Sequence, residues 1–68
     1  MLFKDFLETI TYDAIVDVEV FDGLNYMEYP SQSKACVHQE FLSYKVKEIH
    51  AQEKGMFLVF LHKKIKER

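Results

Sequence analysis

The chain has 68 residues, of which 49% are hydrophobic, and a formal net charge of −2 at pH 7. Such a length allows one domain, residues 1–68, which buries only about 60% of the surface that its unfolded chain exposes. The weak negative charge gives no electrostatic reason to expect nucleic acid or an anionic membrane as a partner.

Two further features of the composition concern the cellular compartment. The single cysteine, Cys36, excludes an intramolecular disulfide and is typical of a reducing compartment. Residues 1–10 lack the basic and apolar regions of a signal peptide, and the apolar run 56–61 is far shorter than the roughly 20 residues of a membrane span. We therefore expect a cytoplasmic protein that does not enter a membrane.

Residues 2–10 are predicted to form a short amphipathic helix. Their apolar side chains recur at helical spacing on one face, whereas the polar side chains lie off it. Because isolated helices below about 12 residues are marginal in water, this helix must pack on another element. The apolar stripe consists of Leu2, Phe3, Phe6, Leu7 and Ile10.

Residues 14–29 are predicted to form a β-hairpin with Asp22 and Gly23 as a two-residue turn. This turn places Asp17 opposite Glu28 and sorts the side chains onto two faces, since alternate residues of a strand point to opposite sides. The apolar face, which we expect to join the core, carries Val16, Val18, Val20, Asn25, Met27 and Tyr29. The other face carries Asp17, Glu19, Phe21, Leu24, Tyr26 and Glu28.

The second half of the chain repeats the order of a helix followed by two strands. Pro30 is expected to end the second strand, because proline cannot donate a ladder hydrogen bond. Ser33 is a suitable N-cap for a second helix over residues 34–43. Residues 45–52 read as a third strand and residues 53–55 as a hairpin loop.

The last predicted strand, residues 56–62, is apolar on both faces, which is typical of a central strand. The order of elements predicts an α+β domain in which a four-stranded, mostly antiparallel sheet carries two short helices on one face. Residues 63–68 are charged and are expected to fray. The predicted core comprises Phe6, Leu7, Val16, Val18, Val20, Met27, Phe41 and Val59.

No pattern in the sequence indicates a catalytic, cofactor or metal site. In the predicted second hairpin His50 faces Leu58 and His62 faces Val46, so the two imidazoles lie far apart along the ladder. Cys36 and His38 are two residues apart on a helix and therefore point in different directions. With neither a Gly-rich phosphate loop nor a paired nucleophile and base, we expect that the chain is not an enzyme and binds no cofactor.

The polar face of the first hairpin is the candidate interaction surface. Aromatic side chains on a face that is expected to meet water indicate that a second copy or a partner protein covers it. We therefore expect a homodimer or another protein partner. The surface consists of Asp17, Glu19, Phe21, Leu24, Tyr26 and Glu28. The alternative is a nucleic-acid-associated protein that uses the basic tail, Lys63, Lys64, Lys66 and Arg68.

Two resemblances bear on these alternatives. The chain resembles a loose group of short uncharacterised proteins of bacterial phages and conjugative elements. The shared features are an opening Phe-Lys-Asp-Phe-Leu helix, a Val-x-Val-x-Val strand, Asp-Gly, and a Phe-Leu segment leading into a last apolar strand. That resemblance implies an accessory or host-interaction role. A short N-terminal helix before a sheet is also similar to Sm-like RNA-binding proteins, although their second RNA-binding signature is missing here. The first resemblance is carried by Phe3, Lys4, Phe6, Leu7, Val16, Val18, Val20, Asp22, Gly23, Tyr26, Leu42, Val46, Ile49 and Val59.

Overall fold

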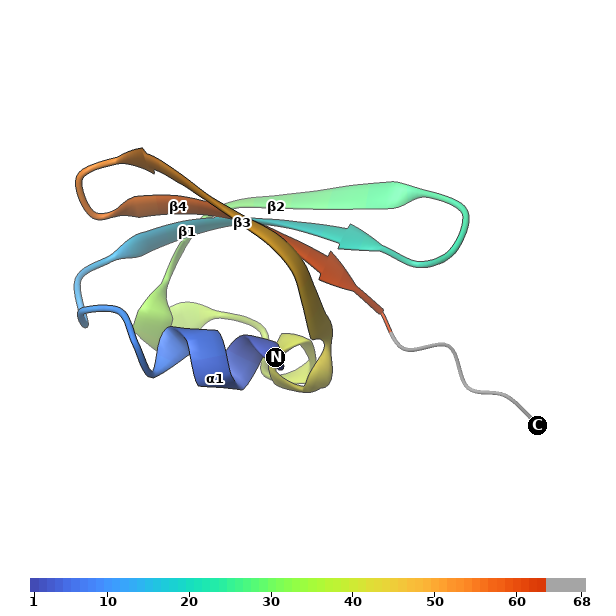
Figure 1. Ribbon diagram of the computed structural model, residues 1–68, viewed down its shortest axis with the longest axis horizontal. Coiled ribbons are helices and arrows are strands. Elements are labelled where there is room, and N and C mark those ends of the chain that lie inside the picture. The colour runs from blue at the N-terminus through green and yellow to red at the C-terminus, as the bar shows by residue number, and fades with distance from the viewer. Residues whose placement is uncertain (64–68) are drawn as a thin grey trace.

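A computed structural model describes residues 1–63 and shows a four-stranded sheet with the helical segments on one of its faces (Figure 1). The four strands agree with the α+β prediction, but the helical part of residues 1–63 is limited to one five-residue helix and two 3₁₀ turns. The elements are helix α1 (Phe3–Leu7), strands β1 (Ile15–Phe21), β2 (Tyr26–Ser33), β3 (Lys45–Glu53) and β4 (Met56–His62), and 3₁₀ turns η1 (Lys34–Cys36) and η2 (Gln39–Ser43).

The sheet is mixed and has the strand order β2-β1-β4-β3. Two antiparallel hairpins, β1–β2 and β3–β4, join through a parallel pairing of β1 with β4. The prediction of a mostly antiparallel sheet therefore misses the central ladder. After β2 the chain crosses one face of the sheet through η1 and η2, so the second hairpin returns beside β1 and makes β4 a central strand, as its apolar sequence predicts.

The core lies between the sheet and the helical layer. Every residue of the predicted core except Met27 is buried. Met27 is 52% exposed because the free end of the β1–β2 hairpin extends beyond the helical layer (Figure 1). The buried cluster consists of Phe3, Phe6, Leu7, Val16, Val18, Val20, Phe41, Tyr44, Val59 and Leu61.

Both predicted helices are shorter than expected. The first ends at Leu7, and beyond it the Thr9 hydroxyl donates a hydrogen bond of 2.6 Å to the carbonyl oxygen of Phe6. The second is replaced by η1 and η2, because Val37 and His38 are extended between them. The ring of His38 lies 5.0 Å from that of Phe41, so aromatic packing competes with helical periodicity in this segment. Ser33 precedes η1 but makes no side-chain capping hydrogen bond.

The first hairpin has a four-residue loop, 22–25, in place of the predicted two-residue turn. Val20 pairs with Met27, and Glu19, not Asp17, lies opposite Glu28. The Asp22 carboxylate accepts hydrogen bonds of 2.9 Å from the backbone N–H groups of Leu24 and Asn25, which closes the longer loop. Because the pairing moves by two residues, each side chain keeps its predicted face, although Leu24 and Asn25 leave the ladder.

Strand β2 continues through Pro30, contrary to the prediction that this proline ends it. β2 is an edge strand, where a missing N–H is tolerated. In the second hairpin, Glu53 pairs with Met56, so the turn consists of Lys54 and Gly55 only.

The predicted register of the second hairpin holds at its centre, where His50 lies opposite Leu58. It fails near the start of β3: His62 lies opposite Lys45 because the ladder is irregular at Lys47. The predicted frayed tail lies outside the described residues except for Lys63, whose N–H donates a 2.8 Å hydrogen bond to the Phe21 carbonyl.

Candidate interaction face

The candidate site is the outer face of the sheet, which we define as the face turned away from α1, η1 and η2. Among residues 1–63, all helical segments lie on the other side, so no element covers it (Figure 1). Alternation along the strands places the odd-numbered side chains of β1 and the even-numbered side chains of β4 on this face. The outer face comprises Ile15, Asp17, Glu19, Phe21, Tyr26, Glu28, Lys45, Lys47, Glu48, His50, Glu53, Met56, Leu58, Phe60 and His62.

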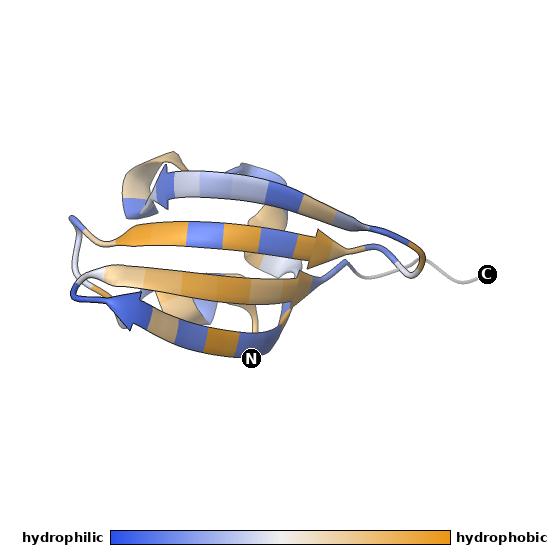
Figure 2. Cartoon of the chain, turned by 90° about the horizontal axis from the view of Figure 1, so that it is seen from above, coloured by the Kyte–Doolittle hydropathy of each residue, from blue (hydrophilic) through white to orange (hydrophobic). Residues whose placement is uncertain are grey.

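The apolar side chains of the outer face gather on its two central strands. Their residues are partly buried by their neighbours, whereas the edge strands β2 and β3 contribute mostly charged and polar side chains. Figure 2, seen from above the sheet, shows β4 as hydrophobic over most of its length, β1 with alternating hydrophobic and hydrophilic residues, and β2 as more hydrophilic. The apolar centre consists of Ile15, Phe21, Met56, Leu58 and Phe60.

An aromatic cluster lies where the outer face meets the free end of the first hairpin. The Phe21 ring is 4.8 Å from the Tyr26 ring and 5.7 Å from the His62 ring. The Lys47 ammonium lies 5.3 Å above the centre of the Phe21 ring, which is a cation–π contact. Tyr26 remains 57% exposed, and Leu24, in the adjoining loop, is 87% exposed.

The carboxylates of the site lie together on the β1–β2 half of the face. Glu19 and Glu28 are cross-strand neighbours, an unfavourable arrangement for two like charges. Asp17 accepts a hydrogen bond of 2.6 Å from the Ser31 N–H. On the other half of the face, the Nε2 atom of His50 lies 2.9 Å from the Oε1 atom of Glu48, within hydrogen-bond distance. A hollow of about 230 Å³ is lined by Asp17, Val18, Glu19, Glu28, Tyr29, Pro30, Gln52 and Leu58.

The structure thus brings together five of the six predicted surface residues and places the sixth, Leu24, in the neighbouring loop. Sequence reasoning missed the contribution of the second hairpin, above all Lys47, Phe60 and His62. These residues reach the same face because β1 and β4 pair in parallel, and no local pattern encodes that pairing. The apolar character of both faces of residues 56–62 was the available signal.

The edges of the sheet are poorly suited to adding a strand from a partner. β2 contains Pro30 and an irregular pairing, and β3 is irregular at Lys47 and Gln52. The start of β3 is occupied by the N-terminal residues, since the Val46 N–H donates a 2.9 Å hydrogen bond to the Met1 carbonyl. Such features disfavour edge-to-edge pairing, so the outer face, and not an edge strand, is the candidate interaction face.

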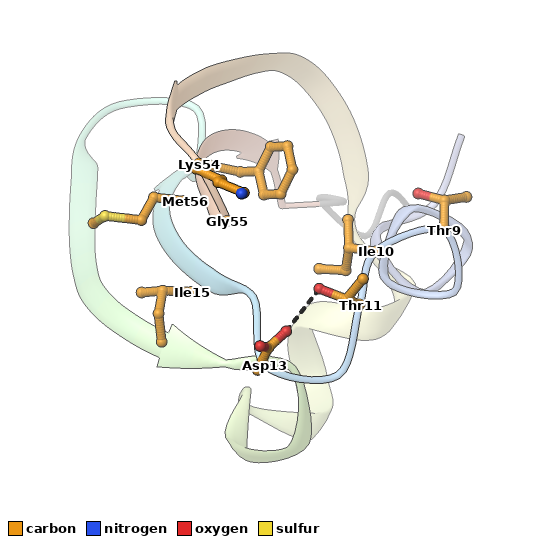
Figure 3. Close-up of a pocket in the computed structure, with 9 residues that line it drawn as sticks. Thr9, Ile10, Thr11, Asp13, Ile15, Lys54, Gly55 and Met56 are labelled. Atoms are coloured by element: carbon orange, nitrogen blue, oxygen red, sulfur yellow. Dashed lines mark hydrogen bonds between the residues drawn. The ribbon is translucent and has the colours of Figure 1, made fainter.

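A larger hollow, of about 710 Å³, opens beside the turn of the second hairpin, at the end of the sheet opposite loop 22–25 (Figure 3). Its polar groups are partly occupied with each other, as the Thr11 hydroxyl donates a 2.8 Å hydrogen bond to the Asp13 carboxylate. The lining residues are Thr9, Ile10, Thr11, Asp13, Ile15, Lys54, Gly55, Met56 and Phe57.

Each histidine has different neighbours, and the cysteine is exposed. His38 packs on Tyr29, His50 pairs with Glu48, and Cys36 is exposed in η1. Within the described part of the chain, no group of three or more histidine, cysteine, aspartate or glutamate side chains is arranged to hold a metal ion.

One carboxyl group near the site has a shifted pKa. The backbone N–H groups of Asn25 and Leu24 hydrogen-bond to the Asp22 carboxylate and lower the pKa of Asp22 below its ordinary value of 3.8. The ionised side chain therefore stabilises the loop that carries the exposed Leu24.

Comparisons of this chain with models of protein families, with curated proteins and with solved structures find no match. Over residues 1–63, none of the helical segments has the length and apolar character needed to cross a membrane.

Proposed function

We propose that the chain is a small non-catalytic protein-interaction module that binds through the outer face of its first hairpin and pairs there with a second copy. The observation that carries this proposal is the uncovered outer face, with aromatic side chains at its centre and at the hairpin end. The binding residues are Asp17, Glu19, Phe21, Leu24, Tyr26 and Glu28.

The anatomy of the face supports a protein as partner. Protein interfaces combine an apolar, aromatic-rich centre with a charged rim. Here β4 and Phe21 provide the apolar part, and the edge strands together with Asp17 and Glu19 of β1 provide the charges. Tyr26 and Leu24 expose large apolar surfaces, and their removal from water is favourable by about 25 cal/mol per Å².

The charges of the face favour protein over nucleic acid. Asp17, Glu19 and Glu28 would lie against the phosphates of a nucleic acid placed on the β1–β2 half of the sheet. Like charges brought together in an interface oppose association. A nucleic-acid role would therefore depend on the basic residues 63–68, most of which lie outside the described residues.

Sedimentation velocity over a dilution series tests the proposal. We expect the wild-type chain to form a dimer that dissociates on dilution, and Tyr26→Ala to shift the chain toward monomer. Tyr12→Ala is the matched control, because Tyr12 is 76% exposed but lies in the segment between α1 and β1. A wild-type chain that stays monomeric, or equal association of both variants, would overturn the proposal. Salt-sensitive retention on an immobilised oligonucleotide would instead favour the nucleic-acid alternative.

A further inference from the structure

We infer that a second copy covers the carboxylates of the outer face with its basic C-terminal segment, residues 63–68. The inference rests on the proposed function, in which the outer face pairs with a second copy, and it names the part of that copy that makes the charge contacts. The structure describes the face and Lys63, whereas residues 64–68 lie outside the described residues.

A row of carboxylates crosses the outer face from one edge of the sheet to the other. Glu28 of β2 pairs with Glu19 of β1. The row continues through Phe60 of β4 to Glu48 of β3. Neighbouring strands lie about 4.8 Å apart, so Glu28 and Glu19 repel each other at close range. A group that binds across this row is therefore favoured if it is positively charged.

The outer face as a whole is negatively charged. Its strands carry five carboxylates and two ammonium groups, which gives a net charge of −3 with the histidines neutral. Direct contact between two such faces would bring like net charges together, which opposes association. The second copy must therefore bring positive charge from outside its own face. The charged side chains of the face are Asp17, Glu19, Glu28, Lys45, Lys47, Glu48 and Glu53.

The segment 63–68 is the part of the chain that is richest in positive charge. It holds four basic residues and one glutamate, a net charge of +3 that equals the excess negative charge of the face. The other basic residues outside the face, Lys4, Lys34 and Lys54, are single residues of α1, η1 and the second hairpin turn. Lys34 already donates a hydrogen bond of 3.1 Å from its Nζ atom to the Ile10 carbonyl. The segment consists of Lys63, Lys64, Ile65, Lys66, Glu67 and Arg68.

The segment begins beside the aromatic cluster of the outer face. The Lys63 N–H donates a hydrogen bond of 2.8 Å to the Phe21 carbonyl. Glu19 lies two residues from Phe21 along β1, which is about 7 Å. The five residues after Lys63 span at most about 17 Å. The segment is therefore long enough to reach the carboxylate row of a copy that packs against the same face.

The sequence of the segment favours the face of another copy over its own face. A return onto its own face would require a tight reversal of the chain directly after β4. Glycine, proline, asparagine, aspartate and serine are the residues that make such turns, and residues 63–68 contain none of them. We therefore expect the contact to form between copies.

Exchange of charge between the segment and the face tests the inference. The tail variant, Lys64→Glu with Lys66→Glu, should self-associate about tenfold or more weakly than the wild type in sedimentation velocity, because its segment meets carboxylates. The matched control is Lys4→Glu with Lys54→Glu. It makes the same change of charge at two exposed residues outside the outer face and should associate as the wild type does.

A face variant provides the second half of the exchange. Glu19→Lys with Glu28→Lys should also associate weakly by itself, because its lysines meet the basic segment of the other copy. A mixture of the face and tail variants should form dimers, since each segment then meets a face of opposite charge. Circular dichroism checks that both variants are folded. Glu28→Lys alone, at an exposed residue of an edge strand, replaces the face variant if the double substitution unfolds the chain.

The outcomes separate this inference from the proposed function. Weak association of the tail variant but not of its control, together with recovery in the mixture, supports the inference. If the tail variant associates as the wild type does, if its control is equally weak, or if the mixture does not recover, the segment is not the contact. In those cases dissociation caused by Tyr26→Ala still supports the outer face as the binding surface.

Two further results would overturn the inference. A tail variant that associates more strongly than the wild type would show that the segment covers its own face. If the wild-type chain stays monomeric, both this inference and the proposed function fall.

Discussion

The carboxylate of Asp17 accepts a hydrogen bond of 2.6 Å from the backbone N–H of Ser31 at an irregular point of the β1–β2 ladder. Val16 pairs with Gln32 and Val18 with Tyr29, so two residues of β2, Pro30 and Ser31, lie opposite Asp17. This is the arrangement of a β-bulge. Ser31 has a φ of 58°, in the left-handed region that side chains disfavour, and the Asp17 carboxylate holds it there.

This contact predicts opposite effects for its two residues. Asp17→Ala should lower the free energy of unfolding by about 1 kcal/mol, because the Ser31 N–H loses its acceptor. Ser31→Gly should raise it by about 0.5–1 kcal/mol, because glycine adopts a positive φ without strain. Urea unfolding measures both changes.

Ser33→Gly is the control for this pair of substitutions. Ser33 has a φ of −83°, so glycine removes no strain there and should slightly destabilise the chain. A Ser31→Gly variant that is no more stable than the wild type would contradict the role given to the bulge.

The bulge also shows why the sequence predicts the faces of the first hairpin better than its pairing. Alternation of valines with polar residues assigns Val16, Val18 and Val20 to the core. A longer loop that shifts the strand pairing by two residues leaves this assignment unchanged, because only a shift by one residue exchanges the two faces. The loop length depends on the hydrogen bonds of the Asp22 carboxylate, which the Asp-Gly signal does not specify.

Features that depend on distant parts of the chain were not predictable in the same way. The parallel pairing of Val18 with Val59 joins segments that are far apart in sequence, and neither segment signals its partner. The segment 34–43 has helical spacing, but its aromatic side chains pack against Tyr29, and this tertiary contact outweighs a weak local preference.

Two leucines offer a matched test of where the core lies. Leu61→Ala should lower the free energy of unfolding by about 2–5 kcal/mol, because Leu61 is fully buried in a central strand and its truncation leaves a cavity. Leu24→Ala should change it by less than about 0.5 kcal/mol, because Leu24 is 87% exposed. Thermal and urea unfolding of both variants measure these changes. Similar losses of stability in the two variants would contradict the assignment of Leu61 to the core and of Leu24 to the surface.

The hairpin loop should respond to acid at Asp22. Its folded-state pKa lies below the ordinary 3.8, so the ionised carboxylate stabilises the fold above that pH and this contribution is lost as the pH falls through the folded-state pKa. In an NMR titration the amide signals of Leu24 and Asn25 should shift with a midpoint below 3.8. A midpoint at or above 3.8 would contradict the hydrogen bonds assigned to Asp22.

The turn of the second hairpin provides a test at the far end of the sheet. Gly55 has a φ of 76°, and no atom outside Gly55 and its two chain neighbours lies within 4 Å of the position that a Cβ would occupy. Gly55→Ala should therefore lower the free energy of unfolding by about 1 kcal/mol through backbone strain alone. Gly55→Asn should cost less, since asparagine tolerates the left-handed region better than alanine does.

The same substitution should be felt at the start of the parallel ladder. The Ile15 N–H donates a 2.8 Å hydrogen bond to the Gly55 carbonyl, so strain in the turn loosens the first contact between β4 and β1. Hydrogen exchange of the Ile15 amide should be faster in Gly55→Ala than in the wild type, whereas that of the Val20 amide, near the other end of β1, should change only as global stability does. The open space around Gly55 excludes crowding as a cause of any loss of stability. Equal stability of the alanine variant and the wild type would therefore contradict the backbone strain predicted for this turn.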